Sequence, residues 1–245
     1  MNLTSEPKND PWGQAIHDHF FREIKDQTIQ VFSSVSEKEE IPVKYLFRDY
    51  RSMPFLEKKA LKICKGHVLD IGAGAGCHSL YLQKNHIQVT ALERSKLAAQ
   101  VIKDQLIMNV ITGDFFQLKN NEKYDSLLLL MNGIGIVGKI SRLQEFFQIC
   151  RDYLKPGGYV ILDSSDISYI FDEGENSDLI EMDWHNEYYG EVIYEIQYES
   201  IKSEPFHWLF IDFNTLSFHA EKNGFFISLI YKDQHHGYLA CLQKK

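Results

Sequence analysis

The chain has 245 residues, of which 44% are hydrophobic, and a formal net charge of −8. This length suits one α/β domain with additions, and the acidic balance disfavours a nucleic-acid surface, which is usually basic. The four cysteines are scattered without a Cys-x-x-Cys pair, which argues against a disulfide framework or a zinc site. With a polar N-terminus and no apolar run long enough to span a membrane, the sequence predicts a cytoplasmic protein.

Residues 1–60 are predicted to form a helical and extended cap segment ahead of the core. Ile16, Phe20 and Ile24 recur at every fourth position and predict an amphipathic helix over residues 12–25. That helix either packs on the domain only or also covers a ligand site.

The rest of the cap segment is less regular. Residues 1–10 are expected to be a frayed end, 28–35 a strand and the acidic stretch 36–40 a solvated loop. Tyr45 and Arg48 lie between two prolines just ahead of the core. They either contact a ligand or only hold the cap segment in place.

A glycine-rich turn organises the core. Apolar residues over 68–71 indicate a short strand that is buried on both faces. Gly72, Gly74 and Gly76 follow, and glycine lets the backbone turn sharply and lets a ligand lie close against it. A helix predicted over 77–85 would point its free N–H groups at that turn, so the three elements form a cradle for a nucleotide.

The spacing of these glycines separates two classes of cofactor. A dinucleotide-binding fold uses Gly-x-Gly-x-x-Gly, but here the third glycine comes one residue early and Cys77 takes its place. With Asp70 directly before the turn, the stretch resembles the first motif of the class I S-adenosylmethionine-dependent methyltransferases. The resemblance implies that S-adenosyl-L-methionine is the cofactor and that Asp70 and the turn belong to its site.

The next two predicted strands lead to acidic residues. Strand 86–94 ends at Glu93, beside Arg94, and a carboxylate there can accept hydrogen bonds from both hydroxyls of a ribose. The alternative is an ordinary exposed acid at a strand end. The third strand runs into the loop 113–115, where the resemblance implies that Asp114 meets the adenine amino group and that its neighbours flank the ring. The alternative is a simple turn aspartate.

The fourth strand, 124–131, has the unbroken leucine run typical of a central parallel strand that is covered on both faces. It ends at Asn132 and Gly133. Ligands of open α/β sheets bind beyond the carboxyl ends of the strands, and the resemblance implies that this loop borders the methyl-donor region. The alternative is a glycine turn that only changes the direction of the chain.

Helix signals and a proline–glycine segment complete the core. Ser95 is expected to cap the helix after the second strand, and Ser141 with Gln144 to form a capping box for the helix after the fourth. The segment LKPGG, residues 154–158, ends that helix before strand 159–166. LKPGG ahead of such a strand is a familiar methyltransferase pattern and a second line of resemblance.

Residues 167–213 are predicted to be a β insertion over the active edge of the sheet. Apolar and polar residues alternate over 191–199, which predicts a half-buried antiparallel strand paired with 207–213. The insertion also carries weak candidates for a general base, whose alternative role is packing or surface exposure. These candidates are His185, Tyr188 and Tyr189.

Residues 214–245 are predicted to complete the core. Asn214 is expected to cap the last helix, and strands 226–232 and 238–244 to form a hairpin across 233–237. This hairpin would supply the antiparallel last strand of the resembled family.

These features predict one domain with its cofactor-binding core over 61–166. The expected fold class is α/β: a Rossmann-like, seven-stranded, mostly parallel sheet with helices on both faces, an antiparallel last strand and a small antiparallel β insertion. The expected function is direct in-line transfer of a methyl group to a small-molecule acceptor, with no metal, nucleic acid or membrane involved. The alternatives are a binding module without catalysis and an NAD(P)-dependent oxidoreductase, which the glycine spacing disfavours. The predicted cofactor-binding residues are Asp70, Gly72, Ala73, Gly74, Gly76, Glu93, Arg94, Gly113, Asp114, Phe115, Asn132 and Gly133.

Overall fold

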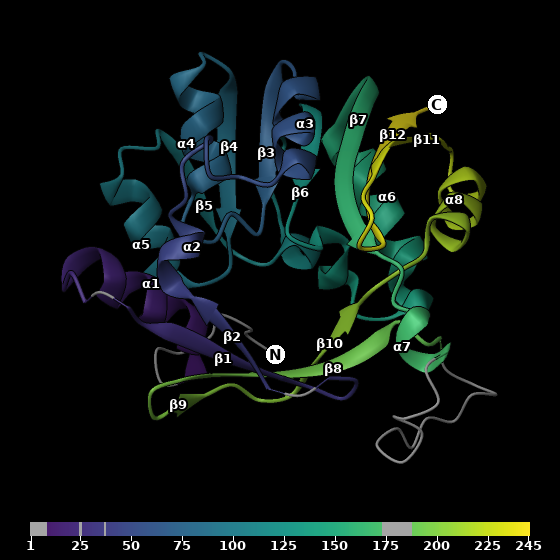
Figure 1. Cartoon of the computed structure of the whole chain (residues 1–245). Coiled ribbons are helices and arrows are strands. Elements are labelled where there is room, and N and C mark those ends of the chain that lie inside the picture. The colour runs from purple at the N-terminus through teal and green to yellow at the C-terminus, as the bar shows by residue number, and fades with distance from the viewer. Residues whose placement is uncertain (1–8, 25, 37, 173–187) are drawn as a thin grey trace.

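The protein contains a larger and a smaller sheet, and the larger sheet lies with the ends of its strands toward the smaller one (Figure 1). The computed structural model describes residues 9–24, 26–36, 38–172 and 188–245, so the candidate His185 lies outside the described residues. No helix in the described part of the chain is long and apolar enough to cross a membrane.

The larger sheet has seven strands in the order β11-β12-β7-β6-β3-β4-β5. The strands from β3 to β7 pair in parallel, whereas β12 pairs antiparallel with both β7 and β11, which confirms the predicted fold class. The bounds are β3 His67–Ile71, β4 Gln88–Glu93, β5 Asn109–Thr112, β6 Tyr124–Leu129, β7 Leu154–Ser165, β11 Phe225–Lys232 and β12 Gly237–Lys244. β7 already begins at Leu154, so the LKPGG segment lies within the strand, where its pairing with β6 is irregular.

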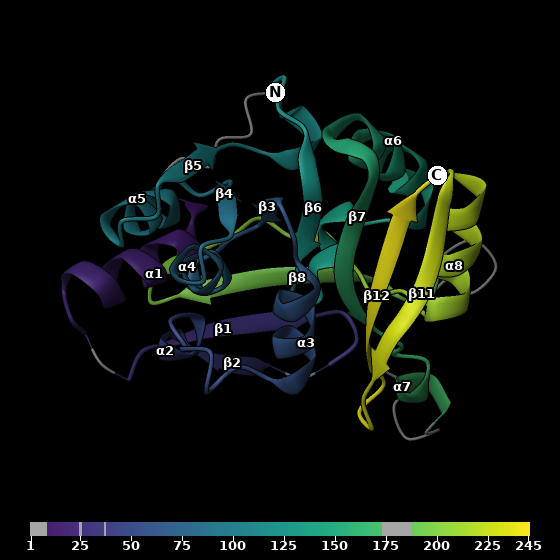
Figure 2. The ribbon, with the colours of Figure 1, turned by 90° about the horizontal axis from the view of Figure 1, so that it is seen from above.

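Helices cover both faces of this sheet (Figure 2). Packed side chains place α6 and α8 on one face and α3, α4 and α5 on the other, because successive residues of a strand point to opposite faces. The helices are α3 Phe55–Ile63, α4 Cys77–Lys84, α5 Lys96–Asp104, α6 Leu143–Tyr153 and α8 Phe213–Lys222.

The helix starts test the predicted caps. Ser95 caps α5 as expected, since its hydroxyl accepts a hydrogen bond from the Ala98 N–H at 3.0 Å. The predicted capping box of Ser141 and Gln144 is wrong, because the chain forms a short 3-10 turn, Ile140–Arg142, before α6 begins. The predicted cap Asn214 is also wrong: Asp212 caps α8 by accepting from the Thr215 N–H at 2.9 Å.

The smaller sheet is antiparallel and joins two distant parts of the chain. Its order is β10-β8-β1-β2, with β9 beside β8. The predicted pair from the insertion is therefore extended by two N-terminal strands, and the stretch expected to be a solvated loop at 36–40 runs into one of them. The bounds are β1 Thr28–Ser33, β2 Glu39–Pro42, β8 Glu191–Tyr198, β9 Ile201–Lys202 and β10 Phe206–Leu209.

This sheet lies across the carboxyl ends of the parallel strands (Figure 1). The strand β10 contacts the 3-10 turn η3, Gly133–Val137, which directly follows β6. Helix α1, Pro11–Phe21, packs between the smaller sheet and α5. The smaller sheet therefore covers the carboxyl ends of the parallel strands, and we call this sheet (β1, β2, β8, β9 and β10) the roof. Helix α1 packs against it.

The beginning of α1 corrects the expected frayed end only at Asp10, because residues 1–8 lie outside the described residues. Asp10 is 7% exposed and accepts a hydrogen bond from the Gly13 N–H at 2.8 Å, so the helix starts at Pro11. The same carboxylate accepts a bond from the Ser95 hydroxyl at 2.5 Å. The helix also ends at Phe21, earlier than predicted. The remaining short helices are α2 Val43–Leu46, α7 Tyr169–Asp172 and η2 Phe115–Gln117.

Candidate functional site

The turn after β3 is bare at two of its three glycines. Gly72 and Gly74 have positive φ angles of +72° and +59°, which glycine adopts without strain. A Cβ at either position would meet no other atom within 4 Å, whereas one at Gly76 would lie 2.9 Å from the Ile107 side chain. Gly72 and Gly74 therefore face open space, and Gly76 is needed for packing.

Asp70 lies beneath this turn. Its side chain is 2% exposed and accepts a hydrogen bond from the Ser79 hydroxyl at 2.6 Å, which ties β3 to α4. Burial raises the pKa of Asp70. Ala73 is also buried, and its N–H donates to the Leu92 carbonyl. Both residues thus shape the turn from inside the protein.

Glu93 reaches from the end of β4 to the bare turn. Its Oε2 accepts from the Gly74 N–H at 2.8 Å and its Oε1 from the Ser95 N–H at 2.7 Å. The residue is 8% exposed, and burial raises its pKa to about 7, although the two backbone donors oppose that rise. Arg94, the next residue, is exposed. The structure therefore brings Glu93 and the glycine turn together, and Glu93 is not the exposed acid of the alternative interpretation.

The loop after β5 offers a second open position. A Cβ on Gly113 would meet no atom within 4 Å. Asp114 is half-buried and accepts a hydrogen bond from the Phe116 N–H at 2.8 Å, which leaves its other oxygen for a partner. The Phe115 ring is 5% exposed and packs against Phe146, so it belongs to the hydrophobic core.

The loop after β6 ties the roof to the larger sheet. The Asn132 amide nitrogen donates to the Leu209 carbonyl of β10 at 3.2 Å, and its oxygen accepts from the Ser164 hydroxyl of β7 at 3.0 Å. Gly133 donates its N–H to Asp163 Oδ1 at 2.9 Å, and a Cβ there would lie 2.7 Å from the Leu129 Cβ. The side chain of Asn132 therefore holds the architecture together around the site.

A buried charge cluster lies beside the start of α4. Arg48 Nη2 and His78 Nε2 approach the two oxygens of Glu57 at 2.6 and 3.0 Å, and the three side chains are 2%, 7% and 5% exposed respectively. Burial favours the neutral form of Glu57, but the hydrogen bonds from His78 and Arg48 outweigh it and lower the pKa. Burial also opposes the charge on His78, while the neighbouring Cys77, Glu57 and Asp70 raise its pKa to about 10.

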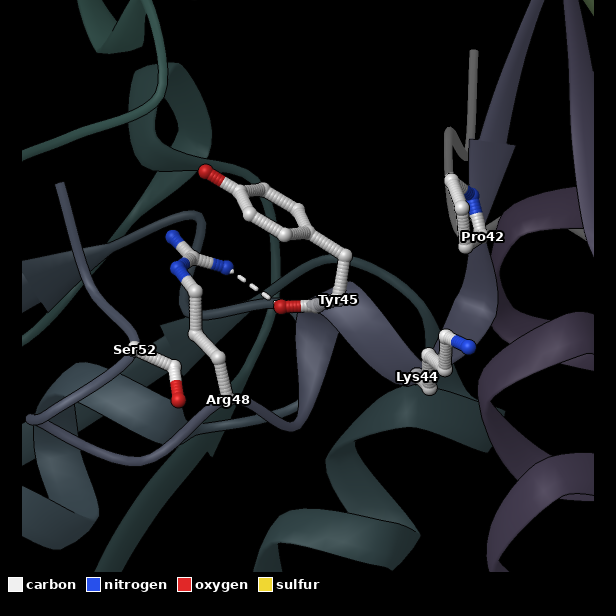
Figure 3. A pocket seen from close by; sticks show the side chains of 5 residues that line it. All are labelled: Pro42, Lys44, Tyr45, Arg48 and Ser52. Carbon is white, nitrogen blue, oxygen red and sulfur yellow. Dashed lines mark hydrogen bonds between the residues drawn. The ribbon is translucent and has the colours of Figure 1, made fainter.

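An open pocket lies on the outer side of this cluster (Figure 3), lined by Pro42, Lys44, Tyr45, Arg48 and Ser52. The guanidinium of Arg48 lies 4.1 Å from the centre of the Tyr45 ring and donates to the Tyr45 carbonyl at 2.7 Å. Tyr45 is exposed and Arg48 is buried. Tyr45 therefore separates the charge cluster from solvent at this pocket.

Tyr188 and Tyr189, the described candidates for a general base, donate to carboxylates. The Tyr188 hydroxyl donates to Asp212 Oδ2 at 2.7 Å and the Tyr189 hydroxyl to Asp166 Oδ1 at 2.8 Å. Burial raises the pKa of both phenols above the ordinary value for tyrosine. Both hydroxyls are therefore protonated at neutral pH and serve as hydrogen-bond donors.

The order of the strands sets the order of these groups along the site. Asp114 follows β5, Glu93 ends β4, the bare turn follows β3, Asn132 follows β6, and Asp163 lies near the end of β7. These groups therefore form a row along the strand ends, on the side of the larger sheet that faces the roof. In the described residues, no group of histidine, cysteine and acidic side chains could hold a metal ion.

Sequence reasoning missed three acidic residues of this region. Asp163 follows an apolar strand, so the rule that singled out Glu93 and Asp114 could have found it. Glu57 sits in an ordinary helix pattern, and Asp10 in a polar terminus, so neither carried a local signal. Their partners Arg48, His78 and Ser95 come from other elements and become visible only in the folded chain.

Comparisons with known proteins agree with this geometry. A family model described as a methyltransferase domain matches residues 68–158. The crystal structure of an S-adenosylmethionine-dependent methyltransferase from Bacteroides fragilis, in complex with S-adenosyl-L-homocysteine, is 40% identical in sequence. It superposes with a TM-score of 0.88, covering 97% of this chain and 96% of that one.

More distant relatives match less of the molecule. The PH0226 protein from Pyrococcus horikoshii is 19% identical with a TM-score of 0.59, covering 78% of this chain and 88% of that one, and shows the shared fold alone. A 23S rRNA (uracil(747)-C(5))-methyltransferase from Pyrococcus horikoshii is 34% identical over 83 residues. That match spans 32% of this chain and only 20% of the relative.

Proposed function

Because this chain belongs to the class I S-adenosylmethionine-dependent methyltransferases, we propose that it transfers a methyl group directly to a small-molecule acceptor. Its cofactor is S-adenosyl-L-methionine, whose sulfonium supplies an activated methyl group and a good leaving group. The protein then contributes mainly by aligning acceptor and methyl carbon, which can supply about 7–11 kcal/mol without a covalent intermediate.

One observation carries the proposed cofactor site. The Cβ positions of Gly72, Gly74 and Gly113 all face open space, and they lie at the ends of neighbouring strands around Glu93. These open positions support a nucleoside at this place, because no side chain of the described protein fills them. Glu93 is the proposed ribose acceptor, since each of its oxygens keeps a lone pair beyond its bond to a backbone N–H.

The neighbouring residues have proposed roles that follow from their free atoms. Asp114 would accept from the adenine amino group with the oxygen that does not cap Phe116. Backbone atoms of the turn would lie against the methionine part. Asp70 would act from below by fixing the turn to α4, and Asn132 and Gly133 by fixing the loop that borders the methyl group.

The roof supports a small acceptor. It is tied to the larger sheet through the Asn132–Leu209 hydrogen bond and through Trp208, which packs against Gly135. An acceptor must therefore enter beneath a fixed sheet, which disfavours a nucleic-acid duplex, as does the net charge of −8. The rRNA methyltransferase relative does not oppose this proposal, because its match covers only part of the core.

Ligand binding tests the proposed cofactor site. S-Adenosylhomocysteine at ~100 times its dissociation constant adds ~2.7 kcal/mol to the stability, so we expect the protein to melt several degrees higher with it and unchanged with NAD. Gly113→Leu places a side chain into the proposed adenosine space. We expect at least tenfold weaker binding, about 1.4 kcal/mol, with an unchanged melting temperature in the absence of ligand.

The control is Gln117→Leu, which adds the same side chain at an exposed neighbouring position. It should bind the ligand as the unmodified protein does. Normal binding by Gly113→Leu would contradict the proposed site. Glu93→Ala is a poorer test, because it also removes the acceptor for two backbone N–H groups.

Label transfer tests the acceptor. The protein is incubated with methyl-labelled S-adenosylmethionine and the metabolite, RNA and protein fractions of a cell extract. We expect label in the metabolite fraction. Label confined to RNA or protein would contradict a small acceptor and leave the cofactor site untouched.

A further inference from the structure

Asp163 is a buried carboxylate with no side-chain partner among the described residues. It is 9% exposed, and its Oδ1 accepts from the Gly133 N–H at 2.9 Å. Among the buried acids of the described chain, Asp10, Asp18, Glu57 and Asp70 all bind a side-chain donor. Within the described part of the chain, Glu93 and Asp163 are the buried acids held by backbone N–H groups alone.

The alternation of β7 shows where this carboxylate points. Val160 and Leu162 pack on the face covered by α6 and α8, whereas Ile161 packs on the face covered by α3. Asp163, two residues after Ile161, therefore lies on the α3 face. The charges of Glu57 from α3 and His78 from α4 act on Asp163, and Asp163 acts on Tyr45 from α2.

These neighbours leave Asp163 without a cation of its own. His78 and Arg48 both direct their donors to Glu57, so neither of them donates a hydrogen bond to Asp163 among the described contacts. A buried negative charge is costly unless a cation or strong donors compensate it. A positively charged ligand would supply what the described residues around Asp163 do not.

The strand order places Asp163 at the acceptor end of the site. Adenosine is proposed to lie over β4 and β5, so the methionine part extends over β3 toward β6. Because β7 is the next strand beyond β6, Asp163 lies just beyond the proposed position of the methyl group, on the side away from the adenosine. We propose that Asp163 binds the amino group of the methyl acceptor, which is therefore a small primary or secondary amine; this inference rests on the proposed function.

In the proposed transfer, the acceptor nitrogen loses one proton and gains one methyl group. The bound ammonium first releases one proton to solvent, which frees the nitrogen lone pair. That pair forms the new bond to the methyl carbon while the carbon–sulfur bond breaks and leaves its electrons on sulfur as a neutral thioether. The methylated nitrogen is positive again, and the Asp163 carboxylate stabilises that charge, as it stabilises the ammonium before the reaction.

The test compares amines with matched alcohols on the protein loaded with S-adenosylhomocysteine. Calorimetric titration uses butylamine with 1-butanol, benzylamine with benzyl alcohol, phenethylamine with phenethyl alcohol, and glucosamine with glucose. We expect at least one amine to bind at least tenfold more tightly than its alcohol. Binding without preference for any amine would overturn the proposal.

The Asp163→Asn variant then tests whether Asp163 causes the preference for amines over alcohols. Asparagine keeps an oxygen for the Gly133 N–H, so the fold should be kept, and we expect the amine preference to vanish while S-adenosylhomocysteine affinity stays within twofold. Asp104→Asn, an exposed aspartate on α5, is the matched control and should keep the preference. A retained preference in Asp163→Asn, or a tenfold loss of S-adenosylhomocysteine affinity, would overturn the proposal.

These outcomes distinguish an error in the proposed function from an error in the assignment of the acceptor. If the unmodified protein fails to bind S-adenosylhomocysteine, the proposed function is wrong. If it binds S-adenosylhomocysteine but prefers no amine, only the assignment of the acceptor is wrong. Should Asp163→Asn not fold, the preference of the unmodified protein still decides the substrate class.

Discussion

At the scale of single residues, the buried acids differ in what they bind rather than in how buried they are. Glu57 accepts hydrogen bonds from both Arg48 and His78, so the side chains of the cluster pair with one another and have a structural role. Among the residues that the structure describes, Glu93 and Asp163 have backbone N–H groups as their only partners and keep acceptor capacity for a ligand. Removing one partner of a buried ion pair typically costs 3–5 kcal/mol, because the other charge is left uncompensated.

The protonation of His78 gives a pH dependence to stability. Its pKa is raised from 6.5 to about 10 in the folded protein. The folded state therefore holds a proton that the unfolded chain loses above pH 6.5, so this contribution is complete below pH 6.5 and is lost as the pH rises toward 10. The slope from this residue is at most about 1.4 kcal/mol per pH unit.

We expect His78→Gln to remove that slope. Urea unfolding of the protein and of the variant between pH 6.5 and 9 measures the difference in the free energy of unfolding, which should shrink steadily with rising pH. His235→Gln, in the exposed hairpin turn, is the control and should follow the unmodified protein. A constant difference between the protein and His78→Gln would mean that His78 is neutral.

At the scale of elements, the helix caps show how far local sequence rules reach. Ser95 caps α5 as predicted, because it lies directly before the helix and its hydroxyl accepts from the Ala98 N–H. For α8 the sequence predicted Asn214 as the cap, but Asp212 takes that role. The Tyr188 hydroxyl binds Asp212 and the backbone N–H of Asp212, which fixes the earlier start.

The cap of α8 can be tested by two matched substitutions. Asp212→Ala should lower the free energy of unfolding by about 1–2 kcal/mol, because it removes the cap and the acceptor for Tyr188. Asn214→Ala, at an exposed position, should stay within about 0.5 kcal/mol. Chemical denaturation of both variants measures the difference, and a larger loss for Asn214→Ala would restore the original prediction.

At the scale of the whole molecule, the roof depends on close packing against the loop after β6. A Cβ on Gly135 would lie 2.1 Å from the Trp208 ring of β10. This glycine therefore lets the roof approach the strand ends, in contrast to Gly72 and Gly113, whose Cβ positions are open. The same residue type thus has opposite uses in the core and at the site.

We expect Gly135→Ala to destabilise the protein by about 1–3 kcal/mol, since the added methyl group displaces Trp208 and overpacks the contact. Hydrogen exchange should also be faster in β10. Gly113→Ala, measured without ligand, is the matched control and should leave the free energy of unfolding within about 0.5 kcal/mol. Equal stability of the two variants would show that Trp208 moves aside without cost.

The sequence by itself determined the strand, turn and helix of the cofactor core, the acidic ends of the next strands and the antiparallel hairpin. These features depend on neighbouring residues, because glycine spacing, strand alternation and caps act over a few positions. Only the tertiary structure decided that β1 pairs with β8, which lies more than 150 residues away, and that Gly76 packs while Gly74 faces open space. Such pairings and packings depend on which distant surfaces meet, and the same holds for Arg48 and His78, which bind Glu57 rather than Asp163 in the folded chain.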